Sequence, residues 1–568
     1  MDFRENWKRW VENADEQYQQ ELADLAEDEK SLEDAFYCDL AFGTAGLRGV
    51  IGMGSNRMNV YTVGRATQGL ATYLNANFDD PSVAICRDSR NMGEMFVQTA
   101  SGVLAANGIR SYIYPRIEPT PSLSFAVRDL GCSAGINITA SHNRAEYNGY
   151  KVYDPTGCQI TSDAARQIQE AIDSTDIFDD VKIEPFDKAL ASGLAQWIPE
   201  DTLDRFIEAT LAQSLEPEGA GEGGLSIVYT PLNGTGLECV TRILKKIGVT
   251  DVTVVPEQAD PDGNFPTCPY PNPEFREALE KGLELCNEVH PDLLLATDPD
   301  ADRVGIAVPH DDDYRLLTGN ETGVLLLDYV CRMRKEAGQD LSDKIAVTTI
   351  VSSTMVDALA RDYGFELRRT LTGFKYIGEQ IAKLEAVGQQ ERFIFGFEES
   401  YGYLAGTEVR DKDAVVASML VCQMARWHRS QGRDLVDAME GLYQRYGYYE
   451  NRTVSKTFPG AEGSAAMKRI TSGLRADPPE QIAGLDVEKV VDYAAGTQMP
   501  MVNGTGEPQM LPESDVLEFQ ISGGNKLIVR PSGTEPKIKA YLFAKGSTRG
   551  EAEDLLKELE QAADGMLA

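Results

Sequence analysis

The chain has 568 residues, 42% hydrophobic and 25% charged, a composition typical of a globular protein with several domains. Its formal net charge of −36 argues against nucleic acid or an anionic membrane as a partner, because both would repel it. No apolar run is long enough to span a bilayer, and the charged N-terminus lacks the apolar core of a secretory signal. The nine cysteines are scattered and form no CxxC pair, which argues against a zinc or disulfide framework. We therefore expect a cytoplasmic protein.

The N-terminal segment, residues 1 to about 35, is expected to form a helix with Trp7, Trp10 and Leu22 on its apolar side. The loop FGTAGLRG follows at 42–49, and its three glycines permit a close approach of the backbone. Because Arg48 lies near its end, we interpret this loop as facing an anion; a flexible turn is the alternative.

A pattern of strand, helix and strand then occurs three times. Each helix ends at a glycine, namely Gly108, Gly248 or Gly364, and a second strand follows at once. Each copy continues with another helix and a third strand, expected at 135–139, 292–296 and 392–395. Every third strand ends in a polar loop: TASHN at 139–143, TDPDADR at 297–303 and GFEES at 396–400. Ligands of α/β sheets bind beyond the carboxyl ends of strands, so the three loops should meet if the domains face one centre.

The first loop places Ser141 beside His142, and Lys151 follows on another apolar run. A hydroxyl flanked by cations suits phosphoryl transfer, with serine as the acceptor. The Gly-x-Ser-x-Gly pattern of hydrolases is absent, and an ordinary turn is the alternative.

The second loop alternates Asp298, Asp300 and Asp302, so the three carboxylates can converge on a hard cation. It is not an EF-hand, because Arg303 takes the place of the glycine at position six. Mg²⁺ fits best, since few protein ligands leave room for a phosphate oxygen. The alternative is a solvated acidic turn, which is our interpretation of the nearby HDDD at 310–313.

The third loop is expected to place Glu398 and Ser400 on one side of an extended segment, where they suit sugar hydroxyls. Lys375, Arg410 and Lys412 lie near helix ends, where such side chains are usually solvated.

The C-terminal part predicts a small α+β domain whose strands flank RPSGTEPK at 530–537. Arg530 can bind a phosphate bidentately while Ser532, Gly533 and Thr534 donate hydrogen bonds, although a plain hairpin loop is the alternative. A linker or variable region is expected over about 453–513, and a surface loop at 216–224. We expect domains at 1–205, 206–325, 326–450 and 451–568.

Together FGTAGLRG, TASHNRAEYNGYK, DPDADR, GFEESYG and RPSGTEPK, in this order, resemble the α-D-phosphohexomutases, most closely their phosphoglucomutase and phosphopentomutase branch. The resemblance implies three related α/β domains around a central cleft and a smaller C-terminal domain of the TATA-binding-protein-like α+β type. It implies phosphoserine at Ser141 and one Mg²⁺ per chain on that group and the three aspartates. Arg48, His142 and Lys151 would serve catalysis, with Lys151 a candidate acid/base. The implied substrate contacts are Arg303, Lys375, Glu398, Ser400, Arg530, Ser532, Gly533 and Thr534.

The implied reaction interconverts glucose 1-phosphate and glucose 6-phosphate through glucose 1,6-bisphosphate, which also serves as activator. Phosphopentomutase, phosphomannomutase and bisphosphate synthase activities remain open, and Asn233 departs from the histidine of many relatives. A metal-dependent sugar phosphatase or a non-catalytic sugar-phosphate sensor would share some of these motifs. We expect a monomer or weak dimer.

Overall fold

The computed structural model describes residues 2–43, 46–216, 224–458, 460–504, 509–532 and 537–567. The chain forms two compact units. The first unit contains Met1–Thr318, Ile377–Gln390 and Ser400–Trp427, and the second contains Gly319–Tyr376, Glu391–Glu399 and His428–Ala568. Within the described residues, no helix combines the length and the apolarity that crossing a bilayer requires.

The N-terminal segment is not one helix, so that expectation was wrong. It forms α1 (Phe3–Asn13), α2 (Gln19–Leu25) and α3 (Glu29–Phe36), with a short 3₁₀ turn before α2. Extended backbone at Ala14 ends α1, and the Asp28 side chain caps α3 by accepting the N–H of Ser31. A long apolar stripe cannot show such breaks, because caps depend on single polar residues.

The threefold repeat is confirmed by the sheets. In each repeat the three predicted strands are parallel, with the third strand beside the first and the first beside the second. The orders are β4-β2-β3, β9-β7-β8 and β14-β12-β13. Their bounds are β2 (Ser82–Arg87), β3 (Arg110–Ile113), β4 (Ala134–Ile138), β7 (Ser226–Thr230), β8 (Asp251–Val254), β9 (Leu293–Thr297), β12 (Ile345–Thr349), β13 (Glu366–Thr370) and β14 (Phe393–Glu398).

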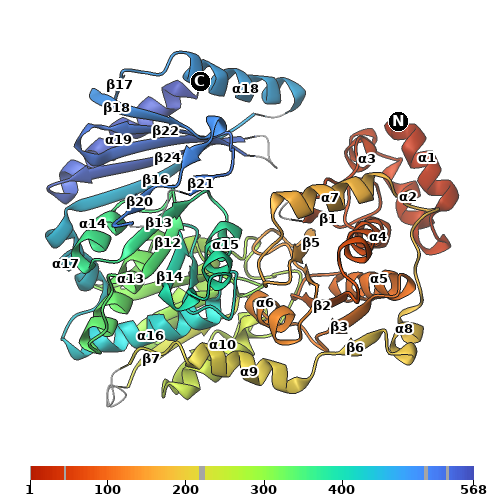
Figure 1. The fold of residues 1–568 in the computed structure, drawn as a ribbon, viewed down its shortest axis with the longest axis horizontal. Coiled ribbons are helices and arrows are strands. Elements are labelled where there is room, and N and C mark those ends of the chain that lie inside the picture. Colours follow the sequence, from red (N-terminus) through yellow and green to blue (C-terminus); the bar gives the residue numbers. More distant parts are fainter. Residues whose placement is uncertain are drawn as a thin grey trace. The chain divides into compact units, whose positions relative to one another are not determined.

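The first domain has a core on each face of its sheet. Along β2, Val83 and Ile85 pack into one cluster while Ala84 and Cys86 pack into another, as alternation along a strand requires. The helices α5 and α6 accordingly lie on opposite sides of β2 (Figure 1). The helices are α4 (Val60–Asn77), α5 (Gly93–Ala106), α6 (Thr120–Asp129), α7 (Ser162–Asp173) and α8 (Phe186–Ser192); β1 (Leu47–Val50) and β5 (Tyr147–Tyr153) extend the sheet beyond β4, and β6 (Ala195–Trp197) lies beside β3.

The second domain continues its sheet with an antiparallel hairpin. Strand β10 (Val304–His310) pairs with β9 and with β11 (Asp313–Leu317), so the segment HDDD is the predicted turn between strands. Helix α9 (Glu200–Leu211) runs through the boundary expected at 205/206, and α13 (Gly319–Glu336) runs through that at 325/326. The other helices are α10 (Gly236–Lys246), α11 (Pro256–Ala259) and α12 (Arg276–Val289).

The second unit joins the three parallel strands of the third repeat to a β-rich C-terminal domain. The latter is an antiparallel sheet in the order β16-β24-β23-β22-β18-β17, against which α19 packs (Figure 1). Its elements are β16 (Tyr448–Thr457), α18 (Gly460–Ala476), β17 (Gln481–Ile482), β18 (Leu485–Asp492), β19 (Thr497–Gln498), β20 (Met501–Val502), β21 (Met510–Leu511), β22 (Leu517–Ile521), β23 (Asn525–Pro531), β24 (Lys537–Gly546) and α19 (Arg549–Met566). The remaining elements of the chain are α14 (Met355–Tyr363), α15 (Phe374–Glu385), β15 (Gly402–Leu404), α16 (Ala414–Ser430) and α17 (Leu435–Tyr446).

The expected linker over 453–513 is wrong. Apart from Pro459 and residues 505–508, which are not described, this stretch supplies β16, α18 and the strands β17 to β21. Strand β20 pairs with β13, and Asn503 donates to the carbonyls of Ala360 and Phe365, so this stretch also joins the C-terminal domain to the third repeat. Within this stretch β17, β19, β20 and β21 have two residues each and are too short to show periodicity.

Candidate active site

Ser141 lies directly beyond β4, at the carboxyl end of the strand. Its side chain is buried, and its Oγ donates a hydrogen bond to Asp298 Oδ2 at 3.0 Å. His142 Nδ1 lies 3.1 Å from the same Oγ. Burial, together with the nearby charges of Arg303 and Arg48, lowers the pKa of His142 well below its ordinary value, so its imidazole is neutral. The first two predicted loops therefore meet.

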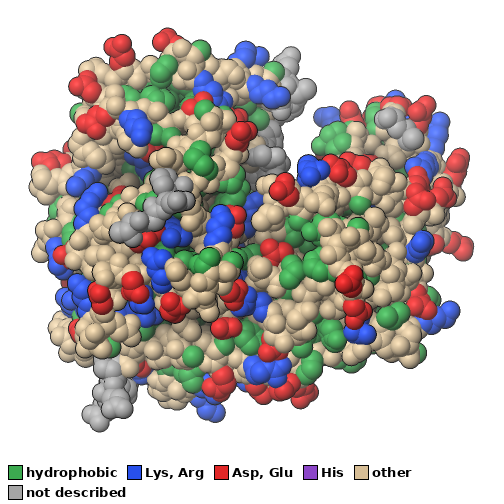
Figure 2. Space-filling model, viewed as in Figure 1, with side chains coloured by type: hydrophobic (Ala, Val, Ile, Leu, Met, Phe, Trp, Pro, Cys, Tyr) green, Lys and Arg blue, Asp and Glu red, His purple; other side chains and the backbone are tan. Residues whose placement is uncertain are grey.

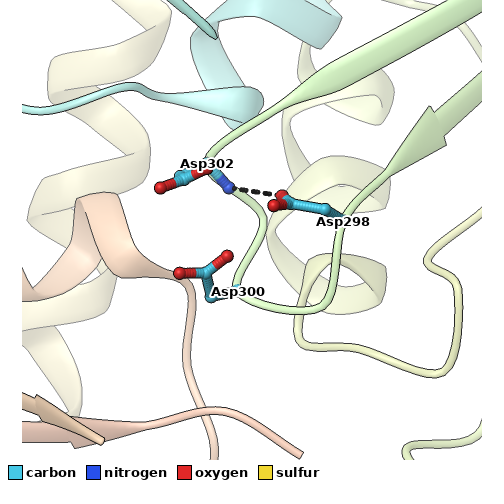
Figure 3. A group of neighbouring side chains, drawn as sticks. All are labelled: Asp298, Asp300 and Asp302. Carbon is cyan, nitrogen blue, oxygen red and sulfur yellow. Dashed lines mark hydrogen bonds between the residues drawn. The ribbon is translucent and has the colours of Figure 1, made fainter. Parts of the chain in front are cut away.

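The three aspartates lie on the loop between β9 and β10 (Figure 3). One ligand oxygen from each lies within 4.8 Å of those of the other two, and all three side chains are buried. The loop is held by Asp298 Oδ1, which accepts the backbone N–H of Asp302 and of Arg303 at 3.0 Å each. The alternative of a solvated acidic turn is excluded by this burial.

Two lysines offset part of the charge of this group. Lys151 Nζ lies 3.0 Å from Asp300 Oδ2, and Lys412 Nζ lies 2.8 Å from Asp302 Oδ2. Burial raises the pKa of Asp298, and the charges of Asp302 and Asp300 raise it further. Burial would also raise the pKa of Asp300, but Lys151 and Lys412 outweigh it, and that pKa is lowered.

The donor set fits a hard divalent cation. Asp300 Oδ1 is buried and accepts no hydrogen bond from the described residues, and the oxygens of Asp302 are offset by the charges of Lys412 and Arg303. A buried carboxylate oxygen that has lost water without gaining a hydrogen-bond donor is costly unless a cation binds it. The three aspartates could therefore hold a metal ion.

Arg48 and Lys151 lie on strands next to the loop between β4 and β5 that carries Ser141, which we call the serine loop. Strand β5, with Lys151, pairs with β4, and β1, with Arg48, pairs with β5. Arg48 Nη1 donates to Asn143 Oδ1 at 3.4 Å. Gly46 has φ +75°, and a Cβ there would lie 1.8 Å from the carbonyl oxygen of Tyr150, so the loop before β1 requires glycine. Thr44 and Ala45 of FGTAGLRG are outside the described residues.

Arg303 extends the cationic lining of the group, with its Nε 3.6 Å from Asp302 Oδ1. Arg410 and Lys412 are buried rather than solvated, contrary to expectation. Lys412 pairs with Asp302 and Asp411, and Arg410 pairs with Glu385. A position before a helix predicts exposure only when no other element covers it, and tertiary packing covers this one.

The remaining candidates belong to the third repeat and the C-terminal domain. Glu398 ends β14, and its Oε1 accepts the N–H of Gly373 at 2.7 Å. Ser400 is in the turn that follows, so the extended segment expected for this pair is wrong. Lys375 lies in the first turn of α15. Ser400 belongs to the first unit, and Lys375 and Glu398 belong to the second.

The expected phosphate cradle begins at the end of β23. Arg530 is the penultimate residue of that strand, and Ser532 follows the strand. Gly533 and Thr534 are outside the described residues.

Thr120 and Asn137 were not predicted from the sequence. They support the loop between β9 and β10 that carries the three aspartates, which we call the metal loop. Thr120, at the start of α6, donates through Oγ1 to Asp300 Oδ2 at 2.9 Å and through its N–H to the Asp300 carbonyl at 2.8 Å. Asn137 Nδ2 in turn donates to Thr120 Oγ1. The sequence signal that could have identified Thr120 is its position in the first turn of a helix that follows a strand.

Asn233 lies at the start of the segment that packs against the metal loop. Its Nδ2 donates to the carbonyls of Glu257 and Asp260. The neighbouring Thr235 donates to the carbonyl of Pro299. The hydrogen bonds described for the Asn233 side chain go to these main-chain carbonyls, and none of them goes to Asp298, Asp300 or Asp302.

Three family models match the chain in order. They are described as phosphoglucomutase/phosphomannomutase α/β/α domain I at residues 39–177, domain II at 204–311 and domain III at 318–446. The matched ranges follow the three repeats.

Full-length relatives are similar to the chain. A phosphoglucomutase of Staphylococcus aureus is 36% identical over 94% of this chain and 95% of its own, and one of Staphylococcus saprophyticus is 35% identical over the same shares. Among solved structures, parafusin, a phosphoglucomutase from Paramecium in its open form, aligns with a TM-score of 0.66 at 16% identity over 93% of this chain and 95% of its own. A phosphoglucomutase/phosphomannomutase family protein from Burkholderia thailandensis aligns with a TM-score of 0.65 at 17% identity over 92% and 97%. The two structural likenesses concern the fold alone.

Proposed function

Because the chain belongs to the phosphoglucomutase/phosphomannomutase family, we propose that it interconverts glucose 1-phosphate and glucose 6-phosphate through a phosphoserine at Ser141. Relatives named phosphoglucomutase, which match nearly the whole chain, favour glucose as the sugar. The single observation that carries the proposal is the hydrogen bond between Ser141 Oγ and Asp298 Oδ2. It puts a candidate phosphate carrier against a buried carboxylate group with open oxygen donors.

In the first half-reaction, a hydroxyl oxygen of the sugar monophosphate attacks the phosphorus on Ser141. The new P–O bond forms to the sugar as the bond to Ser141 Oγ breaks, which yields glucose 1,6-bisphosphate. The sugar hydroxyl loses its proton to Lys151, the candidate acid/base, which must act here as a neutral amine. The ammonium that results can bind the phosphoryl oxygens, and its proton is then available to the departing Ser141 oxygen, so that serine ends as a hydroxyl. The neutral imidazole of His142, 3.1 Å from Ser141 Oγ, can hold the serine hydroxyl that results.

In the second half-reaction, the bisphosphate turns over and returns its other phosphoryl group to Ser141. Both halves use the same serine, so the contacts with the sugar must tolerate two orientations. Binding of the distal phosphate by Arg530, Ser532, Gly533 and Thr534, and of the sugar hydroxyls by Glu398 and Ser400, would meet that need. We assign Lys375 to the same binding role.

The charge of the transferred group would be balanced by three cationic side chains. Arg48, Arg303 and Lys151 would bind the phosphoryl oxygens and orient them. One Mg²⁺ held by Asp298, Asp300, Asp302 and the phosphoserine would add positive charge beside the same oxygens. Exclusion of water from this site would protect the phosphoserine from hydrolysis.

We further propose that glucose 1,6-bisphosphate primes the enzyme by phosphorylating Ser141, and that the protein acts in the cytoplasm as a monomer or weak dimer. Phosphomannomutase activity is the second candidate, because the matched family models name both reactions. Phosphopentomutase activity would use the same residues.

Mass spectrometry of the purified protein, combined with coupled assays, tests the proposal. After incubation with glucose 1,6-bisphosphate, the peptide that carries Ser141 should gain one phosphate. Glucose 1-phosphate should be converted faster than mannose 1-phosphate or ribose 1-phosphate. Release of inorganic phosphate without phosphoserine would instead identify a sugar phosphatase, and absence of turnover on all three sugars would refute the proposal.

A further inference from the structure

The backbone of the serine loop is held by one buried arginine. Arg90 follows β2, and its guanidinium donates to the carbonyl oxygen of Ser141 at 2.6 Å and to those of Arg144 and Tyr147 at 2.8 Å each. It also donates to the carbonyl of Asn143. One planar side chain thus binds four main-chain oxygens along the loop, which an ammonium group cannot do with the same geometry.

Ser141 needs such support because its backbone is in a left-handed conformation. Its φ is +52°, a region that costs a residue with a β-carbon about 1–2 kcal/mol. The strain persists only where surrounding contacts fix it. Here the N–H of Ser141 donates to Thr139 Oγ1 at 2.8 Å, and its carbonyl accepts from Arg90. Both peptide groups beside the strained residue are therefore bound.

A buried carboxylate links these two contacts. Asp88 Oδ2 accepts a hydrogen bond from the hydroxyl of Thr139 at 2.6 Å and lies 3.4 Å from Arg90 Nε. Asp88 Oδ1 accepts the backbone N–H of Arg90. Asp88 and Arg90 are both almost completely buried, so each offsets the charge of the other. Thr139 and Arg90 are thus fixed relative to each other.

The second domain covers this network. The guanidinium of Arg90 lies over the ring of Phe265, 5.1 Å from its centroid. Gly263 is so close that a Cβ would lie 2.6 Å from the backbone nitrogen of Asn91. The enclosure removes water and strengthens the hydrogen bonds of Arg90. It also fixes the arginine against the domain that carries Asp298.

We propose that Arg90 is a positioning residue for phosphoryl transfer: it holds Ser141 in the left-handed conformation that directs Oγ at Asp298. The hydrogen bonds described for the Arg90 guanidinium all go to carbonyl oxygens, and none goes to the Ser141 hydroxyl or to Asp298, Asp300 or Asp302. This inference rests on the proposed function of Ser141. It adds that the rate of transfer depends on four hydrogen bonds from Arg90 to main-chain carbonyl oxygens.

The test compares Arg90→Lys and Arg90→Ala with Arg65→Ala. Arg65 is the matched control, because it also donates to two main-chain carbonyls, those of Ile172 and Thr175, but does so away from Ser141. We expect kcat of both Arg90 variants to fall about 100-fold, since misplacement by about 1 Å can cost that much, while KM stays within about twofold. Guanidinium ion at low, non-denaturing concentration should restore part of kcat to Arg90→Ala in a saturable way. Arg65→Ala should lower the melting temperature and leave kcat unchanged.

The outcomes separate this inference from the proposed function. Wild-type protein that neither carries phosphoserine nor turns over would refute the function itself. Active wild type with an Arg90→Lys variant of unchanged kcat would overturn the inference alone. The inference would also be overturned if the loss of kcat in Arg90→Ala were not restored by guanidinium ion and were proportional to the loss of folded protein. If neither Arg90 variant folds, Thr139→Val, which removes the acceptor of the Ser141 N–H, should lower kcat without changing KM; an unchanged kcat would overturn the inference.

Discussion

Ser141 and Asp298 are 157 positions apart in the sequence, yet Ser141 Oγ donates to Asp298 Oδ2 at 3.0 Å. One residue follows the third strand of the first repeat, and the other follows the third strand of the second repeat. Equivalent strand ends of two related domains thus supply the candidate nucleophile and the candidate metal ligand. The chemistry of the site depends on this juxtaposition, which neither domain could provide by itself.

Replacing Ser141 by alanine should remove turnover. Without Oγ there is no atom to carry the phosphoryl group, and loss of a nucleophile typically lowers kcat by about 10⁴-fold or more. The measurement is conversion of glucose 1-phosphate together with the mass of the peptide that carries position 141. Ser162→Ala, which changes an exposed serine at the start of α7, is the control and should stay active. Wild-type turnover in Ser141→Ala would assign the reaction to another residue.

The sequence predicted elements whose signal is local. A helix that ends at Gly364, for example, shows its apolar periodicity and its end within a few turns, and both were correctly placed. The carboxyl ends of equivalent strands then predicted that Ser141 and the aspartates would be neighbours. That step succeeded because the repeat fixes topology, not only secondary structure.

Residues whose role comes from tertiary packing were not predictable in this way. The position of Lys412 before a helix predicts a solvated side chain, yet its Nζ lies 2.8 Å from Asp302 Oδ2. In the sequence Arg90 is one polar residue in an ordinary turn, and its role is visible only from its hydrogen bond to the Ser141 carbonyl. Strand β20 has only two residues, and its pairing with β13 leaves no pattern in the sequence. In each case the partner is far away in the chain, so no local periodicity records the contact.

Removal of divalent cations should abolish activity reversibly. Asp300 Oδ1, which accepts no hydrogen bond from the described residues, and the close packing of three carboxylates favour a bound cation. A chelator should lower turnover, and added Mg²⁺ should restore it. Mg²⁺ should also raise the melting temperature of the wild type, because binding to the folded state alone stabilises it by about 2.7 kcal/mol at 100 times the dissociation constant.

Two variants sharpen that experiment. Asp300→Asn should weaken the Mg²⁺ dependence of both activity and melting temperature. Asp312→Asn, at an exposed position in the turn between β10 and β11, should leave both unchanged. Full activity of chelated wild-type protein would contradict the assignment of the three aspartates.

Glu118 should make stability depend on pH. Burial raises the pKa of Glu118 to about 7, against the opposing effect of Arg116. The folded state therefore binds the proton more tightly than the unfolded state, whose ordinary value is 4.5. The stability from this group is complete below that value, declines as the pH rises toward about 7, and is absent above it.

Glu118→Gln should remove this dependence. At about pH 8 the variant should be more stable than the wild type by up to about 3 kcal/mol, since one pKa unit corresponds to about 1.36 kcal/mol. Denaturant unfolding at about pH 5 and about pH 8 measures the difference. Glu94→Gln, at an exposed glutamate, is the control. A wild type and a Glu118→Gln variant with parallel pH profiles would refute the prediction.

Salt should stabilise the whole protein. The net charge is −36, and acidic side chains are spread over the visible face rather than gathered in one patch (Figure 2). Repulsion among them destabilises the compact state. Raising KCl from about 0.1 M to about 1 M shortens the Debye length from about 10 Å to about 3 Å, so the melting temperature should rise by several degrees. An unchanged melting temperature across this range would show that the surface charges are already balanced locally.

Arg530→Ala should chiefly raise KM. Arg530 lies at the end of β23, where a guanidinium can bind the phosphate that does not react. A hydrogen bond to a charged group contributes about 1.5–3 kcal/mol, so KM should rise by about 10- to 100-fold. The phosphoserine content of the variant should remain that of the wild type, because position 530 is not assigned to the transfer step. Arg452→Ala changes a half-exposed arginine of the same sheet that pairs with Glu560, and it should leave KM unaltered. If Arg530→Ala shows the KM of the wild type, the cradle is misassigned; if it loses kcat instead, Arg530 acts on the transferred phosphoryl group rather than on the distal one.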